Sequence, residues 1–226
     1  NHLPPASIDL KFIGTAGQSF GTFLSPGIRM QLFGEANDYV GKGMSGGEII
    51  VRPKEEETFV WKDNIIVGNT CLYGSTGGHL FAAGIAGERF GVRNSGAVAV
   101  VEGLGDHACE YMTGGLIISL GKAGSNFGAG MSGGLAFIYD EDNSFENQFN
   151  PELISIERLG ENAEIDALKK VVEAHATATQ SPYAKALLEN WEDIISKFWK
   201  AVPHPSTPET PKNVLKLETL NIPVYA

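Results

Sequence analysis

The chain has 226 residues, 28 of them glycine, which is enough for one sizeable hydrophobic core and a small appendage. Its formal net charge is −10 and its lysines and arginines form no cluster, which argues against nucleic acid as a partner, because phosphate binding needs concentrated positive charge. No apolar segment approaches the roughly 18 residues of a membrane span, so we expect no membrane contact.

At the N-terminus, Pro4 and Pro5 lead into a strand-like stretch over residues 8–12. This region has no initiator methionine and lacks the basic and apolar segments of a signal peptide. We therefore expect the chain to be a piece of a longer polypeptide.

From residue 25 onward, one short motif recurs at nearly constant spacing. Each copy has a serine or threonine, then a glycine, then an apolar run, and the five clear copies place the hydroxyl residue at Ser45, Thr76, Ser95, Thr113 and Ser132. These positions are 31, 19, 18 and 19 residues apart, and a degenerate sixth copy stands at Ser25. The charged segment 53–58 explains the long first gap as a loop. A fixed period of this kind predicts a solenoid of stacked coils.

A period of 19 residues, at about 3.3 Å each, gives a coil of three short strands joined by tight bends. The residue five places before each hydroxyl is apolar and the residue seven places before it is polar, so each coil keeps the same inside and outside. Because one coil cannot bury its apolar side alone, we expect a mostly β fold, a parallel β-helix of about six coils, over residues 1–150. Parallel crossovers are overwhelmingly right-handed, which favours that hand here.

The glycine after each hydroxyl is expected at a bend, where it supplies either a positive φ or room for the backbone of the next coil. These structural turn glycines are Gly46, Gly77, Gly96, Gly114 and Gly133.

After residue 150 the composition changes, and residues 151–202 predict a two-helix appendage. One helix begins near Asn162, and a second opens with Ser181 as N-cap and Pro182 at its first position and runs to Phe198. We expect their apolar faces to pack on the solenoid. Residues 203–226 contain five prolines, four of them between 203 and 211, and predict an extended tail.

The residues that look reactive favour structural interpretations. Segments 41–46 and 128–133 match the G-x-G-x-x-G dinucleotide pattern, but a strand follows each one instead of the helix that would meet a pyrophosphate. Cys71 and Cys109 are interpreted as buried, reduced thiols. Asp106-His107 is interpreted as a surface bend, and the other histidines lack metal-ligand spacing. The sequence predicts no catalytic, cofactor-binding or metal-binding residue.

One polar column is left as a candidate site. Asp38, Glu88 and Asp106 occupy matching positions in their coils, and stacked like charges about 5 Å apart need neutralising. Arg89 or Arg93 can do this in an ion-pair ladder. A ligand groove is the alternative interpretation.

Several longer motifs point to a family. They are segments 14–21, 34–43, 86–97, 103–107 and 130–134, continued by 150–153 and 188–191. Together they resemble the C-terminal domain of the glutamate synthase large subunit, which is named for its G-x-G-x-G pattern. The resemblance implies a right-handed β-helix within an enzyme that makes two glutamates from glutamine and 2-oxoglutarate.

In that family FMN and an iron–sulfur cluster serve the parent enzyme, and the catalytic residues lie upstream of this domain. The resemblance therefore implies a structural role, in which a rigid block holds the amidotransferase and FMN synthase domains in position. Those domains or subunits are the expected partners, an oligomer is compatible with this role, and the expected location is the cytoplasm or, in a plant or alga, the plastid stroma. Ser125, where the family pattern has arginine, and the tail after Val202 leave the electron donor open.

Two other functions stay open. A free-standing β-helix enzyme would use Asp38, Asp106 and Arg89 as a sparse version of the calcium cluster of polysaccharide lyases. A subunit like the β-helical part of formylmethanofuran dehydrogenase would share the coils, but it should lack the motif around Gln18 and the helical segment 188–191.

Overall fold

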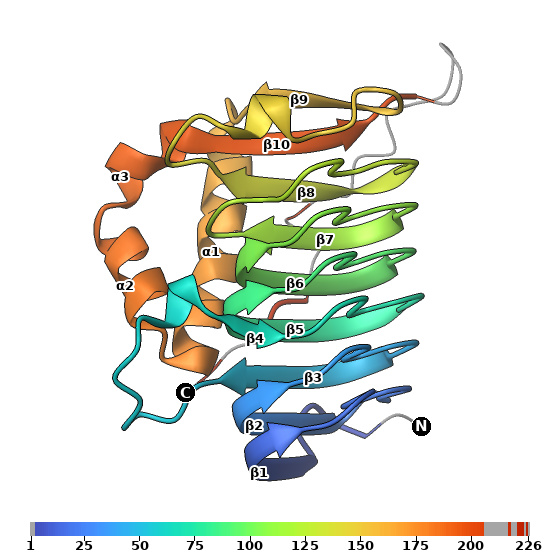
Figure 1. Cartoon of the computed structure of the whole chain (residues 1–226), viewed down its shortest axis with the longest axis vertical. Helices are drawn as coiled ribbons and strands as arrows, with labels where there is room; N and C mark the ends of the chain where they lie inside the picture. Colours follow the sequence, from blue (N-terminus) through green and yellow to red (C-terminus); the bar gives the residue numbers. More distant parts are fainter. Residues whose placement is uncertain (1–2, 206–216, 218–220, 224, 226) are drawn as a thin grey trace.

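The protein is a solenoid of parallel β-strands with helices along one side (Figure 1). The computed structural model describes residues 3–205, 217, 221–223 and 225. Seven parallel strands stack in the order of the chain, and the short strand β4 (Ile65–Val67) pairs with β2 and β5. The seven are β1 (Ile8–Ala16), β2 (Ile28–Ala36), β3 (Ser45–Arg52), β5 (Gly77–Ala86), β6 (Ser95–Leu104), β7 (Thr113–Ser119) and β8 (Gly133–Tyr139).

The predicted mostly β, parallel solenoid is confirmed, with about seven coils instead of six. The additional coil is that of β1, which pairs with β2 in register from Ile8↔Ile28 to Ala16↔Ala36. No hydroxyl–glycine motif precedes β1, so counting motifs misses this coil although residues 8–12 are strand-like.

The inside of the solenoid is an apolar core. The residues five places before the motif hydroxyls all point inward and are completely buried, namely Val40, Cys71, Phe90, Ala108 and Phe127. This confirms the predicted inward column. Since each of these side chains packs on the equivalent residue of the next coil, the core is continuous along the solenoid axis.

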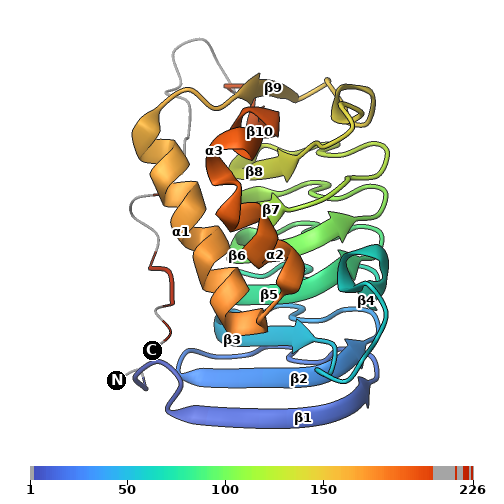
Figure 2. The ribbon, with the colours of Figure 1, turned by 90° about the vertical axis from the view of Figure 1, so that its left-hand side faces the viewer.

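A second core lies between the outer face of the solenoid and the helices α1 (Asn162–Thr179), α2 (Pro182–Glu189) and α3 (Trp191–Ile194), which run along that face in Figure 2. In β6 the alternation of a strand sends Val98 and Val100 outward, into the same buried cluster as Leu168 and Val172 of α1. The predicted packing of the appendage on the solenoid is confirmed.

The second predicted helix is shorter than expected. Ser181 does cap it, because its Oγ accepts a hydrogen bond from the Ala184 N–H at 3.1 Å. However, α2 ends at Glu189, where Asn190 leaves helical geometry with φ −111° and ψ 25°. The periodic pattern continues because α3 and the 3-10 turn Ile195–Lys197 pack on the same face, so the pattern does not reveal the break.

Two antiparallel strands close one end of the solenoid. Strand β10 (Phe198–Pro203) pairs with β8 and with β9 (Ile154–Arg158), so segment 151–202 contains strands that the helical pattern does not predict. Asp140 holds this cap by accepting hydrogen bonds from Ser144 N, Phe145 N and Trp199 Nε1. Most of the predicted extended tail, including 206–216 and 218–220, lies outside the described residues.

The opposite end is open. Among the described residues, strand β1 has β2 as its one sheet neighbour, and several large apolar side chains of this coil are exposed. They are Ile8, Leu10, Phe12 and Ile13, with 38 to 78% of their surface accessible. Both ends of the sheet therefore present an edge strand, β9 at one end and β1 at the other, and the β1 end also presents exposed apolar surface.

Candidate functional site

The bends between strands share one unusual backbone conformation. In all six bends between residues 17 and 131, the residues six, four and two places before the motif hydroxyl have positive φ. Six places before the hydroxyl, every bend has a non-glycine residue with positive φ. These residues are Ser19, Tyr39, Thr70, Arg89, His107 and Asn126, with φ between 57° and 66°. The glycines of the G-x-G pattern, such as Gly41 and Gly43, occupy the other two places. The pattern therefore reflects bend geometry, and strands β3 and β8 follow its two full copies as expected.

The turn glycines lie where the backbones of two coils approach closely. A Cβ on Gly114 would stand 2.3 Å from the Ser95 carbonyl oxygen, and one on Gly133 would stand 2.1 Å from that of Thr113. The equivalent positions at Gly77 and Gly96 also meet a carbonyl of the preceding coil, and Gly46 meets Pro26. Positive φ falls instead on the following glycine, for example Gly115 at 82°. These glycines are therefore explained by the close approach of two backbones and not by a positive φ of their own.

The polar column connects coil to coil through side-chain-to-backbone hydrogen bonds. Asp38 Oδ1 accepts from Asn69 N–H at 2.7 Å, Asn69 Oδ1 accepts from Glu88 N–H at 2.8 Å, and Asp106 Oδ1 accepts from Ser125 N–H at 2.7 Å. Backbone amides thus stabilise these oxygens from the coil that follows. The column can hold the coils in register, which is a structural task.

Arg89 lies beside this column but points elsewhere. Its side chain is 56% exposed, and its ion pair within the described residues is with Glu110, at a Nε–Oε2 distance of 4.0 Å. The structure therefore connects Asp38 to the backbone of Glu88 through Asn69, bonds Asp106 to the coil that follows, and leaves the guanidinium of Arg89 on the surface.

A buried polar cluster was not anticipated from the sequence. Glu102 Oε1 accepts from Ser181 Oγ and lies 3.2 Å from His175 Nε2, and both side chains of the Glu102–His175 pair are completely buried. Ser181 is also the N-cap of α2, so the cluster joins β6 to the junction of α1 and α2. The available signal was a single glutamate in the otherwise apolar run 97–104. Because all three residues are buried, we interpret the cluster as a structural contact that holds the two helices against the solenoid.

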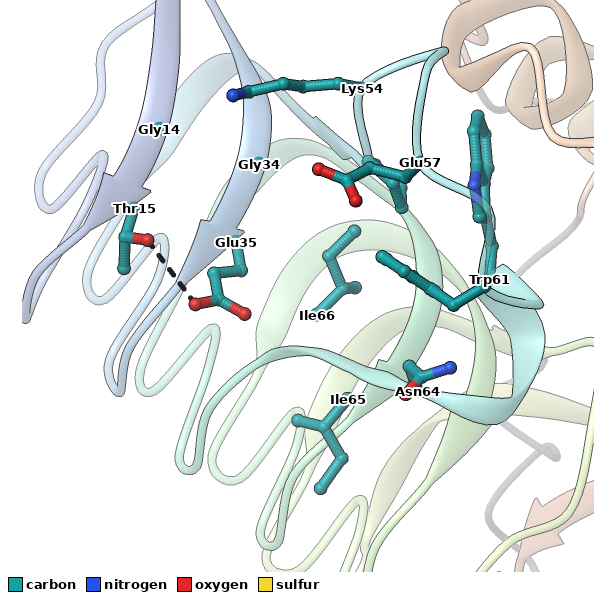
Figure 3. Close-up of a pocket in the computed structure, with 12 residues that line it drawn as sticks. Gly14, Thr15, Gly34, Glu35, Lys54, Glu57, Trp61, Asn64, Ile65 and Ile66 are labelled. Atoms are coloured by element: carbon teal, nitrogen blue, oxygen red, sulfur yellow. Dashed lines mark hydrogen bonds between the residues drawn. The ribbon is translucent and has the colours of Figure 1, made fainter.

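An open cavity lies under the loop that interrupts the repeat. It has a volume of about 240 Å³ and is bounded by the edge of β1 and β2 on one side and by residues 53–66 on the other (Figure 3). Thr15 and Glu35, joined by a 3.4 Å hydrogen bond, form the strand wall. Lys54, Glu57 and Trp61 belong to the loop wall.

The two cysteines lie inside the solenoid as free, buried thiols, as predicted. Burial raises the pKa of Cys71 to about 12 and raises that of Cys109 as well. Across the part of the chain that the structure describes, no group of three or more metal-ligating side chains is gathered. Within the same residues, no helix is long and apolar enough to span a membrane.

Comparison with known proteins agrees with this architecture. A family model described as the GXGXG motif matches residues 1–204. The chain belongs to the GXGXG motif family. The GXGXG chain is 54% identical over 206 residues to ferredoxin-dependent glutamate synthase 2 of Synechocystis sp.. These 206 residues are 91% of this chain and 13% of that protein.

Two other relatives show the same proportions. Ferredoxin-dependent glutamate synthase 1 of Arabidopsis thaliana, described as chloroplastic/mitochondrial, is 54% identical over 91% of this chain. The ferredoxin-dependent glutamate synthase of Antithamnion sp. is 54% identical over 87% of it. In each case the GXGXG chain spans only 13% of the relative's length. The resemblance to the glutamate synthase GXGXG domain is thereby confirmed.

Proposed function

We propose that this GXGXG chain is a non-catalytic domain of a ferredoxin-dependent glutamate synthase, where it holds the amidotransferase and FMN synthase domains in relative position. The observation that carries the proposal is the comparison itself. The chain matches relatives of that name along nine-tenths of its own length but covers only 13% of theirs. The relatives' names also favour ferredoxin as the electron donor of the parent enzyme, and the names of the plant relatives favour the plastid as its location.

The construction of the domain supports a positioning role. Neighbouring coils are joined by the sheet and by hydrogen bonds across the bends, the polar column adds bonds between some of them, and the interior is filled. Such a block transmits force without deforming, because close-packed interiors have low compressibility. Its open end and the cavity under residues 53–66 present apolar surface of the kind that protein interfaces bury.

The residues present do not fit the cofactors of the proposed parent enzyme. A flavin phosphate would need free backbone amides, but those of the bends are already bonded between coils, for example Gly41 N–H to Phe20 O at 2.9 Å. Iron–sulfur ligation needs several accessible thiolates, whereas the chain has two cysteines and both are buried with raised pKa. We therefore assign FMN and the cluster to other domains of the parent.

The structure also bears on the alternative of a lyase-like calcium site. Each of Asp38 and Asp106 has one carboxylate oxygen engaged by a backbone amide of the following coil. These hydrogen bonds give both aspartates a structural role, which is to join neighbouring coils. We therefore retain the scaffold as the function that these contacts support.

The purified chain should be colourless, should bind no FMN and should not hydrolyse glutamine. The physical reason is that the bend amides and both thiols, the groups best suited to such ligands, are occupied or buried. Flavin fluorescence after gel filtration with excess FMN, and glutamate release from glutamine, are the measurements. Stoichiometric flavin, or glutaminase activity above a blank, would contradict the proposal.

A further inference from the structure

The cavity under residues 53–66 occupies a gap in the stacking of strands. Strand β2 pairs with β3 as far as Phe33↔Arg52, and pairing resumes only at Ala36↔Val67 of β4. Between these points, Gly34 and Glu35 keep their partners in β1 but have none in β3 or β4. The inserted loop arches over this gap, so the cavity is built into the architecture at the one long interval of the repeat.

The floor of the cavity is hollowed by two glycines. Gly14 and Gly34 are paired across β1 and β2, and both have positive φ, at 115° and 153°. A Cβ on Gly34 would stand 2.0 Å from the Gly14 carbonyl oxygen, so this position excludes any side chain. A Cβ on Gly14 would meet no atom within 4 Å, so the space beside this glycine is free for a group from outside.

The charges that line the cavity are not balanced. Glu35 and Glu57 contribute two carboxylates and Lys54 one ammonium group, and none of the three forms an ion pair within the described residues. Figure 3 shows Glu57 extending from the loop toward the strand that carries Glu35. The site has a net negative charge and therefore favours a cationic group.

The walls and rim are apolar. Ile66 and Trp61 line the interior, and Phe59 and Ile65 stand at 44% and 64% exposure. A volume of about 240 Å³ lies below the roughly 300–1,000 Å³ of small-molecule sites. An apolar rim around a small acidic hollow matches the stem and the charged head of a lysine or arginine side chain.

We propose that this cavity receives a lysine or arginine side chain from another domain of the same parent polypeptide. The apolar surface around that basic residue then covers Phe59 and Ile65. The inference rests on the proposed function, because the relatives' polypeptides are several times longer than this chain, which spans 13% of them. The acidic lining selects a basic residue, and the exposed rim selects a protein surface.

The test is hydroxyl-radical footprinting of the full-length parent enzyme, with oxidation of Phe59 and Ile65 followed by mass spectrometry. We expect both residues to be oxidised slowly in the native enzyme. In the double variant Glu35→Gln/Glu57→Gln, Phe59 and Ile65 should be oxidised several times faster. Glu57→Lys should raise their oxidation rate more than Glu57→Gln does. Glu56→Gln and Glu56→Lys, in the same loop but outside the lining, are the matched controls and should leave the native rate unchanged.

Rapid oxidation of Phe59 and Ile65 in the native enzyme, or the same rate in native and double-variant enzyme, would overturn the inference. Protection that disappears on dilution would also overturn it, since a second copy would then be the occupant. A footprint that responds as expected while glutamine hydrolysis stays coupled to glutamate synthesis would support the contact and refute the positioning function. The two proposals can therefore fail separately.

Discussion

Replacing Gly114 with valine should lower the free energy of unfolding by about 3 kcal/mol, because overpacking against a backbone group cannot be relieved by a rotamer change. The Cβ would stand 2.3 Å from the Ser95 carbonyl oxygen, at the start of β7, where the Gly114 N–H is already bonded to the preceding coil. The two coils must move apart to admit it, which breaks the register of β6 and β7. Urea unfolding and thermal melts of the purified chain measure the effect.

Glu56→Ala is the control for the glycine variant. Glu56 is exposed in the inserted loop, so its removal should leave the melting temperature close to that of the native chain. Equal melting temperatures for Gly114→Val and Glu56→Ala would show that the coils are not stacked at Gly114 as the structure has them.

Replacing Glu102 with leucine should also cost about 3 kcal/mol, since removing one partner of a buried polar cluster leaves Ser181 and His175 without the hydrogen bonds that they make to it. Ser181 Oγ would lose its acceptor, and His175 Nε2 would face an apolar side chain in a site without solvent. The helices α1 and α2 should loosen first, because their junction is held at this point. Hydrogen exchange of residues 175–189, together with urea unfolding, measures both effects.

The matched control makes the same substitution on the surface. Glu189→Leu changes an exposed glutamate at the end of α2 and should be nearly neutral. Glu102→Gln should fall between the two, because its amide oxygen can still accept from Ser181. If the Glu102→Leu chain has the same unfolding free energy and the same hydrogen exchange as the native chain, the cluster does not hold the junction of α1 and α2 in place.

Repetition made much of this fold predictable. The spacing of Ser45, Thr76, Ser95, Thr113 and Ser132 was sufficient for the coil, its inward residues and its bends, because each coil obeys the same packing constraint as its neighbours. The coil of β1 was missed since the motif marks a bend, and no such bend precedes this strand.

The features outside the repeat were harder to predict. The end of α2 at Glu189 and the strand β10 depend on tertiary packing, because Phe198 continues the helical spacing of apolar residues while pairing with Tyr139 in the sheet. The Glu102 cluster joins residues more than 70 positions apart, and the cavity at Glu35 and Glu57 depends on where the inserted loop folds back. Such long-range contacts leave no periodic trace in the sequence.

The measurement that tests the positioning role most directly is the ratio of glutamine hydrolysed to glutamate formed in the full-length parent enzyme carrying Arg89→Glu. Arg89 is exposed and its ion pair is with Glu110, so charge reversal alters the surface beside the polar column with little effect on the core. Lys122→Glu is the matched control, because Lys122 is likewise exposed and paired with one acid, Asp142.

We predict that Arg89→Glu keeps both half-reactions, measured separately, near native rates while more glutamine is hydrolysed per glutamate formed, and that Lys122→Glu leaves this ratio unchanged. The melting temperature of the variant chain should stay close to native, which separates loss of coupling from loss of fold. Loss of one half-reaction alone, in a variant whose chain still melts like the native one, would contradict the positioning role and assign this surface to that active site.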